Sequence, residues 1–410
     1  MEKCVEKSYY VQNFGVFLIV FSYFNVFTNI FALGLILAVG GLLYRHFKYQ
    51  QPLFEIQQMD VPWSTIAVML LFCLTGYLAA LFALNVAVSK KVAVDLFNYM
   101  RPFFLLLIFA NKNNSFLQAI WAGVFAGAIG LCFGGDNALK QYFVLHQRRP
   151  NGIFNNTNAL AGHLLLIIPT IFAGLYDNNF DKKLKYVAVF SLMIVILTLI
   201  ITESRGAMIA LVLAGVGAIF YYIRNIKKAV VVMFIAVILG IALVSFLAPE
   251  NIDRFGKIVQ YQKLEVYNER ERVYLWKSAA MMFKDHPLAG IGLGGFNAAY
   301  NSGYMMPQAT EKYLVHPHNM LMYSLSETGI IGTTGLLALI GWQLFVSYKN
   351  RYKNTRNPYA DMFFFTIILL LIHGMVDCMF HVGSFARIYW ILWALTCLSI
   401  TFNNKMSDKK

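Results

Sequence analysis

The sequence predicts an all-α polytopic membrane protein with about twelve transmembrane helices. Of its 410 residues, 59% are hydrophobic and only 13% are charged, and the mean hydropathy is +0.58. Soluble domains carry about 25% charged and 45–50% apolar residues. A folded core cannot hide this much apolar surface, so most of it must face lipid. We therefore expect a single integral membrane domain over residues 1–410, and exclude a disordered chain, a collagen-like fibre and a disulfide-stapled scaffold.

Each expected span is a mostly apolar stretch of the length that a helix needs to cross the hydrocarbon, roughly 20 residues. The candidates are residues 13–28, 30–45, 62–84, 92–110, 115–134, 158–176, 184–202, 205–223, 229–248, 319–347, 360–380 and 384–402. The first pair is ambiguous, because only Asn25, Thr28 and Asn29 interrupt the apolar stretch 14–44, which could also form one tilted helix.

The distribution of charge predicts the orientation. Lys and Arg outnumber Asp and Glu by 34 to 20, and a soluble protein with this excess would be a candidate for nucleic-acid binding. Here the basic residues gather in alternate connections, as they do in cytoplasmic loops. We expect both termini to be cytoplasmic, no nucleic-acid partner and no removable signal peptide. The five cysteines are scattered and predict neither a disulfide nor a zinc site.

Two segments on the outer side are longer than a tight turn. One covers residues 134–158, and the other is a long loop over residues 249–318. Within the long loop, apolar residues recur at near-helical spacing from Glu269 to Lys284, which predicts an amphipathic helix on the membrane surface. The glycines between Gly290 and Gly295 predict a turn after it.

Arginines on the outer side are the first candidates for chemistry. Arg205 is expected at the start of a helix, where it is either a snorkelling anchor paired with Glu203 or an anion ligand. A guanidinium group binds phosphate oxygens bidentately and keeps its charge, and a helix N-terminus favours an anion. Arg272, Arg148 and Arg149 are unremarkable loop charges taken singly. Because all four fall on one side of the membrane, they predict a pyrophosphate site at the lipid boundary.

Two histidines come where the long loop re-enters the membrane. His316 and His318 flank Pro317 and precede Asn319. Histidine is the usual general base near neutral pH. A role in loop packing is the alternative. A metal site at these histidines would need further ligands, and the sequence has no acidic cluster nearby to supply them.

Four segments, in order along the chain, resemble motifs of the O-antigen ligase and polymerase superfamily. They are Arg149–Phe154 with Asn158, Thr202–Ala207, Arg272–Trp276 followed by His286–Phe296, and His318–Asn319 continuing through Glu327-Thr328-Gly329 to Gly332. The resemblance spans residues 145–390. It implies a bacterial inner-membrane glycosyltransferase with a GT-C-type architecture. Such an enzyme transfers a glycan from undecaprenyl pyrophosphate on the periplasmic side, without a metal or other cofactor.

Carried over residue by residue, the resemblance assigns the catalytic roles to Arg205, Arg272 and His318. Arg149 matches less closely, with Arg148 as its alternative, and both would bind pyrophosphate or glycan together with His316 and Asn319. His316 ranks second as a base. One of three carboxylates, on Glu203, Glu327 or Asp377, would orient the histidine.

Three functions remain open from the sequence. A lipid A-core:O-antigen ligase passes the glycan to a core sugar hydroxyl. A repeat-unit polymerase performs the same chemistry on a second carrier-linked glycan. No large soluble domain of the kind found in protein-glycosylating relatives is recognisable, which favours a lipid-linked or glycan acceptor. A solute transporter would also show twelve spans, but its site is expected near the bilayer midplane.

Overall fold

The computed structural model is built from helices. It describes residues 2–25, 28–53, 61–111, 113, 115–133, 137–147, 149–177, 180, 182–247, 267–312, 314–352 and 356–407. The helices in the first half are α1 (Glu2–Asn25), α2 (Thr28–Tyr49), α3 (Trp63–Leu81), α4 (Val86–Tyr99), α5 (Arg101–Ile108), α6 (Ser115–Phe133), α7 (Ala138–Phe143), α8 (Thr157–Tyr176) and α9 (Lys182–Ile201). They are followed by α10 (Arg205–Tyr222), α11 (Ile226–Leu247), α13 (Tyr267–Asp285), α14 (Phe296–Ala299), the π-helical turn η3 (Tyr300–Tyr304), α15 (Met320–Lys349), α16 (Pro358–Gly374) and α17 (Gly383–Ser407).

The predicted all-α membrane architecture is confirmed. Within the described ranges, nine helices are long and apolar enough to cross a membrane, and Tyr9–Phe24 of α1 and Pro358–Gly374 are shorter apolar helices. The stretch 14–44 forms two helices rather than one, because α1 ends at Asn25 and α2 begins at Thr28. Their backbones approach closely, since a Cβ on Gly15 or Gly34 would overlap the other helix.

The predicted span 92–110 is wrong as a single helix. The chain forms α4 and α5 instead, and the break falls at Met100, immediately before Arg101-Pro102. Pro102 occupies the first turn of α5, where its missing N–H costs nothing. Pro102 has no N–H with which to continue the hydrogen-bond ladder of α4, and its ring would clash with the carbonyl group four residues earlier, so α4 cannot run on through it.

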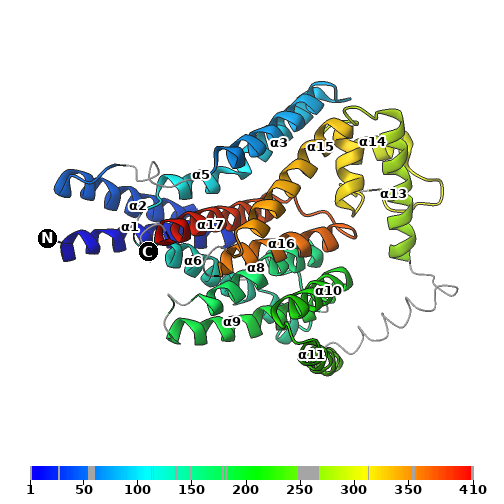
Figure 1. The fold of residues 1–410 in the computed structure, drawn as a ribbon. Helices are drawn as coiled ribbons and strands as arrows, with labels where there is room; N and C mark the ends of the chain where they lie inside the picture. The colour runs from blue at the N-terminus through cyan, green and yellow to red at the C-terminus, as the bar shows by residue number, and fades with distance from the viewer. Residues whose placement is uncertain are drawn as a thin grey trace.

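The described part of the predicted long loop, from residue 267 onward, lies at one end of the bundle, and α1 and α17 extend to the other. Figure 1 shows N and C together beside α1 and α17, whereas α13 crosses the opposite end, near the start of α15. The amphipathic helix predicted over 269–284 is confirmed as α13. Its position on a membrane surface stays a prediction, as does the cytoplasmic location of the termini. Residues 248–266, which begin the long loop, lie outside the described residues.

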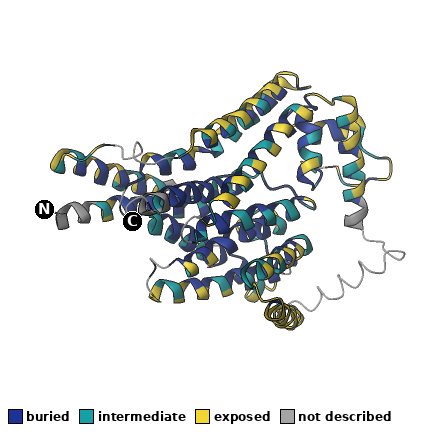
Figure 2. Ribbon diagram, viewed as in Figure 1, coloured by how far each residue is buried: buried dark blue, intermediate teal, exposed yellow. Residues whose placement is uncertain are grey.

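Three helices form the centre of the bundle. The membrane-length windows of α8 and α17 are mostly buried, and α16 packs against both, as the dark blue ribbon in Figure 2 shows. In contrast, α11 is almost entirely exposed and apolar, which suits a helix whose surface faces lipid.

Helix α15 is broken at Gly329, which has φ 58° and ψ −157°. The segment 287–292 inserts against this break and pairs with the backbone on both sides of it. The four hydrogen bonds, of 2.9–3.0 Å, are donated by Ile291 to Ser326, by Gly292 to Glu327, by Ile330 to Pro287 and by Ile331 to Leu288. Buried backbone groups that are freed by a helix break must find such partners.

Glycine is required on both sides of this junction. A Cβ on Gly290 would overlap the Glu327 carbonyl group, and one on Gly329 would overlap Leu288. The carboxylate of Glu327 accepts N–H groups from Gly294 at 2.8 Å and Phe296 at 3.0 Å. The motif Glu327-Thr328-Gly329 therefore attaches the outer loop to α15.

We expect Gly329→Ala to lower the thermal unfolding temperature of the purified protein in detergent. Its backbone conformation is nearly exclusive to glycine, and forcing another residue into it costs about 1–3 kcal/mol. Gly341→Ala in the same helix is the control, because a Cβ there meets nothing within 4 Å. Equal unfolding temperatures for the two variants would contradict the requirement for glycine at 329.

Candidate active site

Arg205 is the first residue of α10, and Arg149 lies in the loop before the neighbouring helix α8. Asn156 caps α8 by accepting the Ala159 N–H at 2.7 Å, and α10 begins at Arg205 itself. The hydroxyl of Ser204 donates to the side-chain oxygen of Asn158 at 3.1 Å. This bond joins the two helix starts, and so brings Arg149 and Arg205 to the same place.

The loop that carries Arg149 is held by one side chain of α7. The side-chain oxygen of Gln141 accepts the N–H groups of Asn151 at 3.0 Å and Gly152 at 2.9 Å, and its amide nitrogen donates to the Gly152 carbonyl at 3.1 Å. Gly152 has φ +59°, a conformation that glycine adopts without strain.

Arg272 is positioned by two anchors on α13. The buried carboxylate of Glu271 accepts the N–H of Thr310 at 3.0 Å and its hydroxyl at 2.8 Å. One turn along, the indole N–H of Trp276 donates to the Pro317 carbonyl at 2.9 Å. Because these contacts hold α13 against the segment that precedes α15, Arg272 lies beside the re-entry point of the chain.

His318 is paired with a carboxylate from another helix connection. Its Nδ1 lies 3.1 Å from Oδ1 of Asp377, which follows α16. Asn319 caps α15 by accepting the Met322 N–H at 3.0 Å, and its amide donates to the Met375 carbonyl at 3.0 Å. Asn319 therefore holds the segment that carries His318 at a fixed distance from the turn that carries Asp377.

The charge state of Asp377 determines the tautomer of His318. Burial alone would raise the pKa of Asp377, but the hydrogen bond with His318 and the nearby imidazoles outweigh it and hold that pKa below its usual value. An ionised carboxylate only accepts hydrogen bonds, so Nδ1 of His318 must carry the proton. In a neutral His318 the lone pair is then on Nε2, as a general base requires.

His316 lies behind His318 and is buried. Its Nδ1 accepts the backbone N–H of His318 at 3.1 Å, so this nitrogen carries no proton. Burial, together with nearby His318, His381 and Arg272, lowers the pKa of His316 well below its usual value. His316 is thus a neutral side chain that supports the loop.

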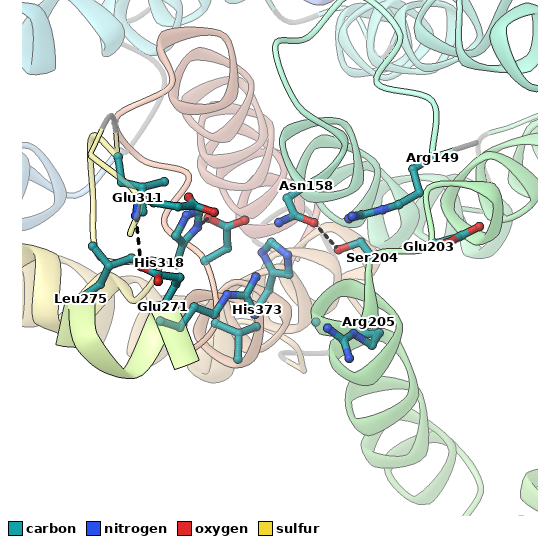
Figure 3. Close-up of a pocket in the computed structure, with 15 residues that line it drawn as sticks. Arg149, Asn158, Glu203, Ser204, Arg205, Glu271, Leu275, Glu311, His318 and His373 are labelled. Atoms are coloured by element: carbon teal, nitrogen blue, oxygen red, sulfur yellow. Dashed lines mark hydrogen bonds and ion pairs between the residues drawn. The ribbon is translucent and has the colours of Figure 1, made fainter. Parts of the chain in front are cut away.

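These elements surround one cavity, which we call the Arg–His pocket. It has a volume of about 180 Å³ and is lined by Arg149, Arg205 and Arg272, by His318 and His373, by Glu203, Glu271, Glu311 and Asp377, and by Asn158, Ser204, Gly206, Leu275, Leu314 and Val376. Figure 3 shows His318 and Glu271 on one side and Arg149, Ser204 and Arg205 on the other. Pockets for drug-sized ligands are about 300–1,000 Å³, so this one suits a compact charged group.

The pocket brings together six of the ten residues predicted from the sequence: Arg149, Glu203, Arg205, Arg272, His318 and Asp377. His316 and Asn319 do not line it: His316 accepts the backbone N–H of His318, and Asn319 caps α15. Glu327 binds the backbone of the 294–296 turn, and Arg148 lies outside the described residues. Of the three candidate carboxylates, Asp377 contacts His318.

Several lining residues were not singled out from the sequence as site residues. Asn158 belonged to a motif, and His373 was noted only as lying near Asp377. Ser204 belonged to the motif Thr202–Ala207, whereas Glu271 and Glu311 carried no signal in the sequence. Their contribution depends on contacts between segments far apart in the chain.

One group in the described part of the chain has the composition of a metal site. Nitrogen and oxygen atoms of His316, His318 and Asp377 lie within 4.8 Å of one another. Nδ1 of His316 is engaged by a backbone N–H, and Nδ1 of His318 by Asp377. A cation bound there through these two nitrogens would have to displace both hydrogen bonds, so the arrangement fits a histidine–carboxylate pair better.

Part of the chain matches a known protein family. Residues 190–337 match the family described as O-Antigen ligase. This segment includes Arg205, Arg272 and His318, whereas Arg149 and Asp377 lie outside it. The comparison with curated proteins found no match.

Proposed function

We infer that this chain, which belongs to the O-antigen ligase/polymerase superfamily, transfers a glycan from a polyprenyl-pyrophosphate donor to a sugar hydroxyl. One observation carries the proposal: three guanidinium groups and a histidine–carboxylate pair line the same small pocket. The donor is undecaprenyl pyrophosphate in the bacterial inner membrane, and the pocket faces the periplasm. The preferred acceptor is the lipid A-core, which makes the protein an O-antigen ligase.

The arginines of the pocket would bind the diphosphate. Arg205 and Arg272, with Arg149, approach from three different elements, and a guanidinium group binds phosphate oxygens with two parallel hydrogen bonds. Fixed cations at the boundary of the bilayer also stabilise the charge that develops on the leaving group. The reaction then needs no metal, since the arginines supply the positive charge.

His318 would act as the general base. The acceptor hydroxyl oxygen attacks the anomeric carbon of the donor sugar from the face opposite the diphosphate. As the new C–O bond forms, the bond from this carbon to the diphosphate oxygen breaks, and the acceptor proton passes to Nε2 of His318. A single displacement of this kind inverts the anomeric configuration. Asp377 stabilises the resulting imidazolium.

A polymerase that uses a second carrier-linked repeat as acceptor is the alternative within the same superfamily. A deletion strain distinguishes the two. Loss of a ligase leaves long carrier-linked polymer and rough lipopolysaccharide, whereas loss of a polymerase leaves core capped by a single repeat. A solute transporter is the remaining alternative, and solute uptake by proteoliposomes without any lipid donor would favour it.

The proposal is tested by reconstitution with an undecaprenyl-pyrophosphate glycan and candidate acceptors in the presence of EDTA. We expect transfer to a lipid A-core acceptor at the same rate with and without the chelator. Abolition by EDTA and recovery with added Zn²⁺ would contradict the metal-independent mechanism. Transfer only to a second carrier-linked glycan would identify a polymerase.

We expect Arg205→Lys to reduce the transfer rate at least about a hundredfold, the effect of removing one preorganised donor from a developing anion. Lysine keeps the charge but loses the bidentate geometry. Arg224→Lys, in the exposed connection after α10, is the matched control and should leave the rate unchanged. Near-normal transfer by Arg205→Lys would exclude the bidentate role.

We expect His318→Ala to reduce transfer by about 10²–10⁴-fold, the usual contribution of a general base, while donor binding is retained. Single-turnover transfer and donor binding are measured on the same preparation. If turnover persists, the base is another residue, and His316 is the next candidate to replace.

A further inference from the structure

His373 is a buried histidine whose role in the Arg–His pocket the proposed mechanism leaves unassigned. It lies in the last turn of α16, is 3% exposed and lines the pocket. Figure 3 shows it between His318 on one side and Arg205 on the other. Gly206, the second residue of α10, packs against its ring, since a Cβ there would lie 3.7 Å from Cδ2.

The ring nitrogens of His373 have no hydrogen-bond partner among the described residues. The other two buried histidines of the described chain differ in this respect. His163 contacts the Ala159 carbonyl through Nδ1 and the Ser384 hydroxyl through Nε2, and Nδ1 of His316 accepts a backbone N–H. Buried polar groups are nearly always hydrogen-bonded, so a histidine left open toward a pocket indicates a ligand.

The surroundings of His373 define the chemistry of that ligand. Arg272 and Asp377 both act on it electrostatically, and Arg205 is on its other side. Burial, the largest influence, and Arg272 both disfavour a positive charge on this ring, against the opposite effect of Asp377, so the ring is a neutral donor of one N–H. An anion with several acceptor oxygens would both satisfy this N–H and fit between the arginines.

We propose that the His373 imidazole N–H donates a hydrogen bond to the phosphate group that joins the donor diphosphate to its sugar. This inference rests on the proposed function and assigns a further ligand to the same site. His373 would hold the leaving group between the arginines, while His318 remains available to the acceptor.

Replacement of the His373 side chain should leave its backbone role intact. The His373 carbonyl accepts the N–H groups of Val376 and Asp377, each at 3.0 Å, and these bonds position Asp377 whatever the side chain. Substitutions at position 373 therefore remove the imidazole N–H without displacing the His318–Asp377 pair.

The test measures binding of radiolabelled undecaprenyl diphosphate, without a glycan, to the full-length protein in nanodiscs. His373→Phe keeps a ring but has no donor, and His373→Leu is a second variant without a donor. In His373→Asn and His373→Gln, the amide nitrogens replace Nδ1 and Nε2 respectively. His286→Phe, in the turn after α13, is the matched control outside the pocket. Thermal unfolding is recorded for each variant.

We expect His373→Phe and His373→Leu to bind about ten- to a hundredfold more weakly, the range for loss of a hydrogen bond to a charged group. Either His373→Asn or His373→Gln should bind within a few fold of the wild type, and this result would identify the donating nitrogen. The His286→Phe control should bind normally.

Two different results would overturn the inference. If the wild type binds and folded His373→Phe or His373→Leu binds equally well, the role of His373 is wrong while the proposed function stands. If both amide variants lose as much affinity as His373→Phe, the N–H donor is also excluded. Failure of the wild type to bind undecaprenyl diphosphate would instead overturn the proposed donor, and the inference with it.

Discussion

The site depends on one constraint, which is that a buried backbone polar group cannot stay without a partner. The break in α15 at Gly329 frees such groups, and the segment 287–292 satisfies them. The same pairing fixes the long outer loop to the bundle. Glu327 strengthens the attachment by binding the N–H groups of the turn before α14. As a result α13 is held across the end of the bundle, and Arg272 can face Arg205.

The electrostatic balance of the Arg–His pocket depends on which of its charged groups already have hydrogen-bond partners within the protein. Its carboxylates outnumber its arginines, so the net charge of the lining residues alone would not predict an anion site. Glu271 is occupied by Thr310, however, and Asp377 is occupied by His318. Figure 3 shows the Glu203 carboxylate directed away from His318. In the proposed function, a phosphate oxygen between Arg205 and His373 would meet hydrogen-bond donors, in an environment where electrostatic interactions are stronger than in water.

In the proposed function, the same pocket would separate the two tasks of a glycosyl transfer. On one side, the arginines and His373 would supply positive charge and a hydrogen-bond donor for the leaving group. On the other side, Asp377 fixes the tautomer of His318 so that Nε2 can accept a proton. The connection between the two sides is short: the carbonyl group of His373 accepts the N–H of Asp377. One turn at the end of α16 therefore serves both tasks.

The sequence by itself determined the membrane class and, in the described part of the chain, nine of the twelve expected spans, α13 and six of the fifteen residues that line the pocket. Hydropathy and charge act locally, and a run of apolar residues needs no distant contact to be recognised. One span was predicted where the chain forms α4 and α5, because the apolar composition of residues 92–110 was given more weight than the single proline that breaks the helix. Only the tertiary structure decided that Asp377, and not Glu203 or Glu327, pairs with His318, and that His373 faces the pocket without a partner. Both depend on how α16 packs beside α10 and α15, and hydrogen bonds between segments so far apart in the chain leave no periodic trace in the sequence.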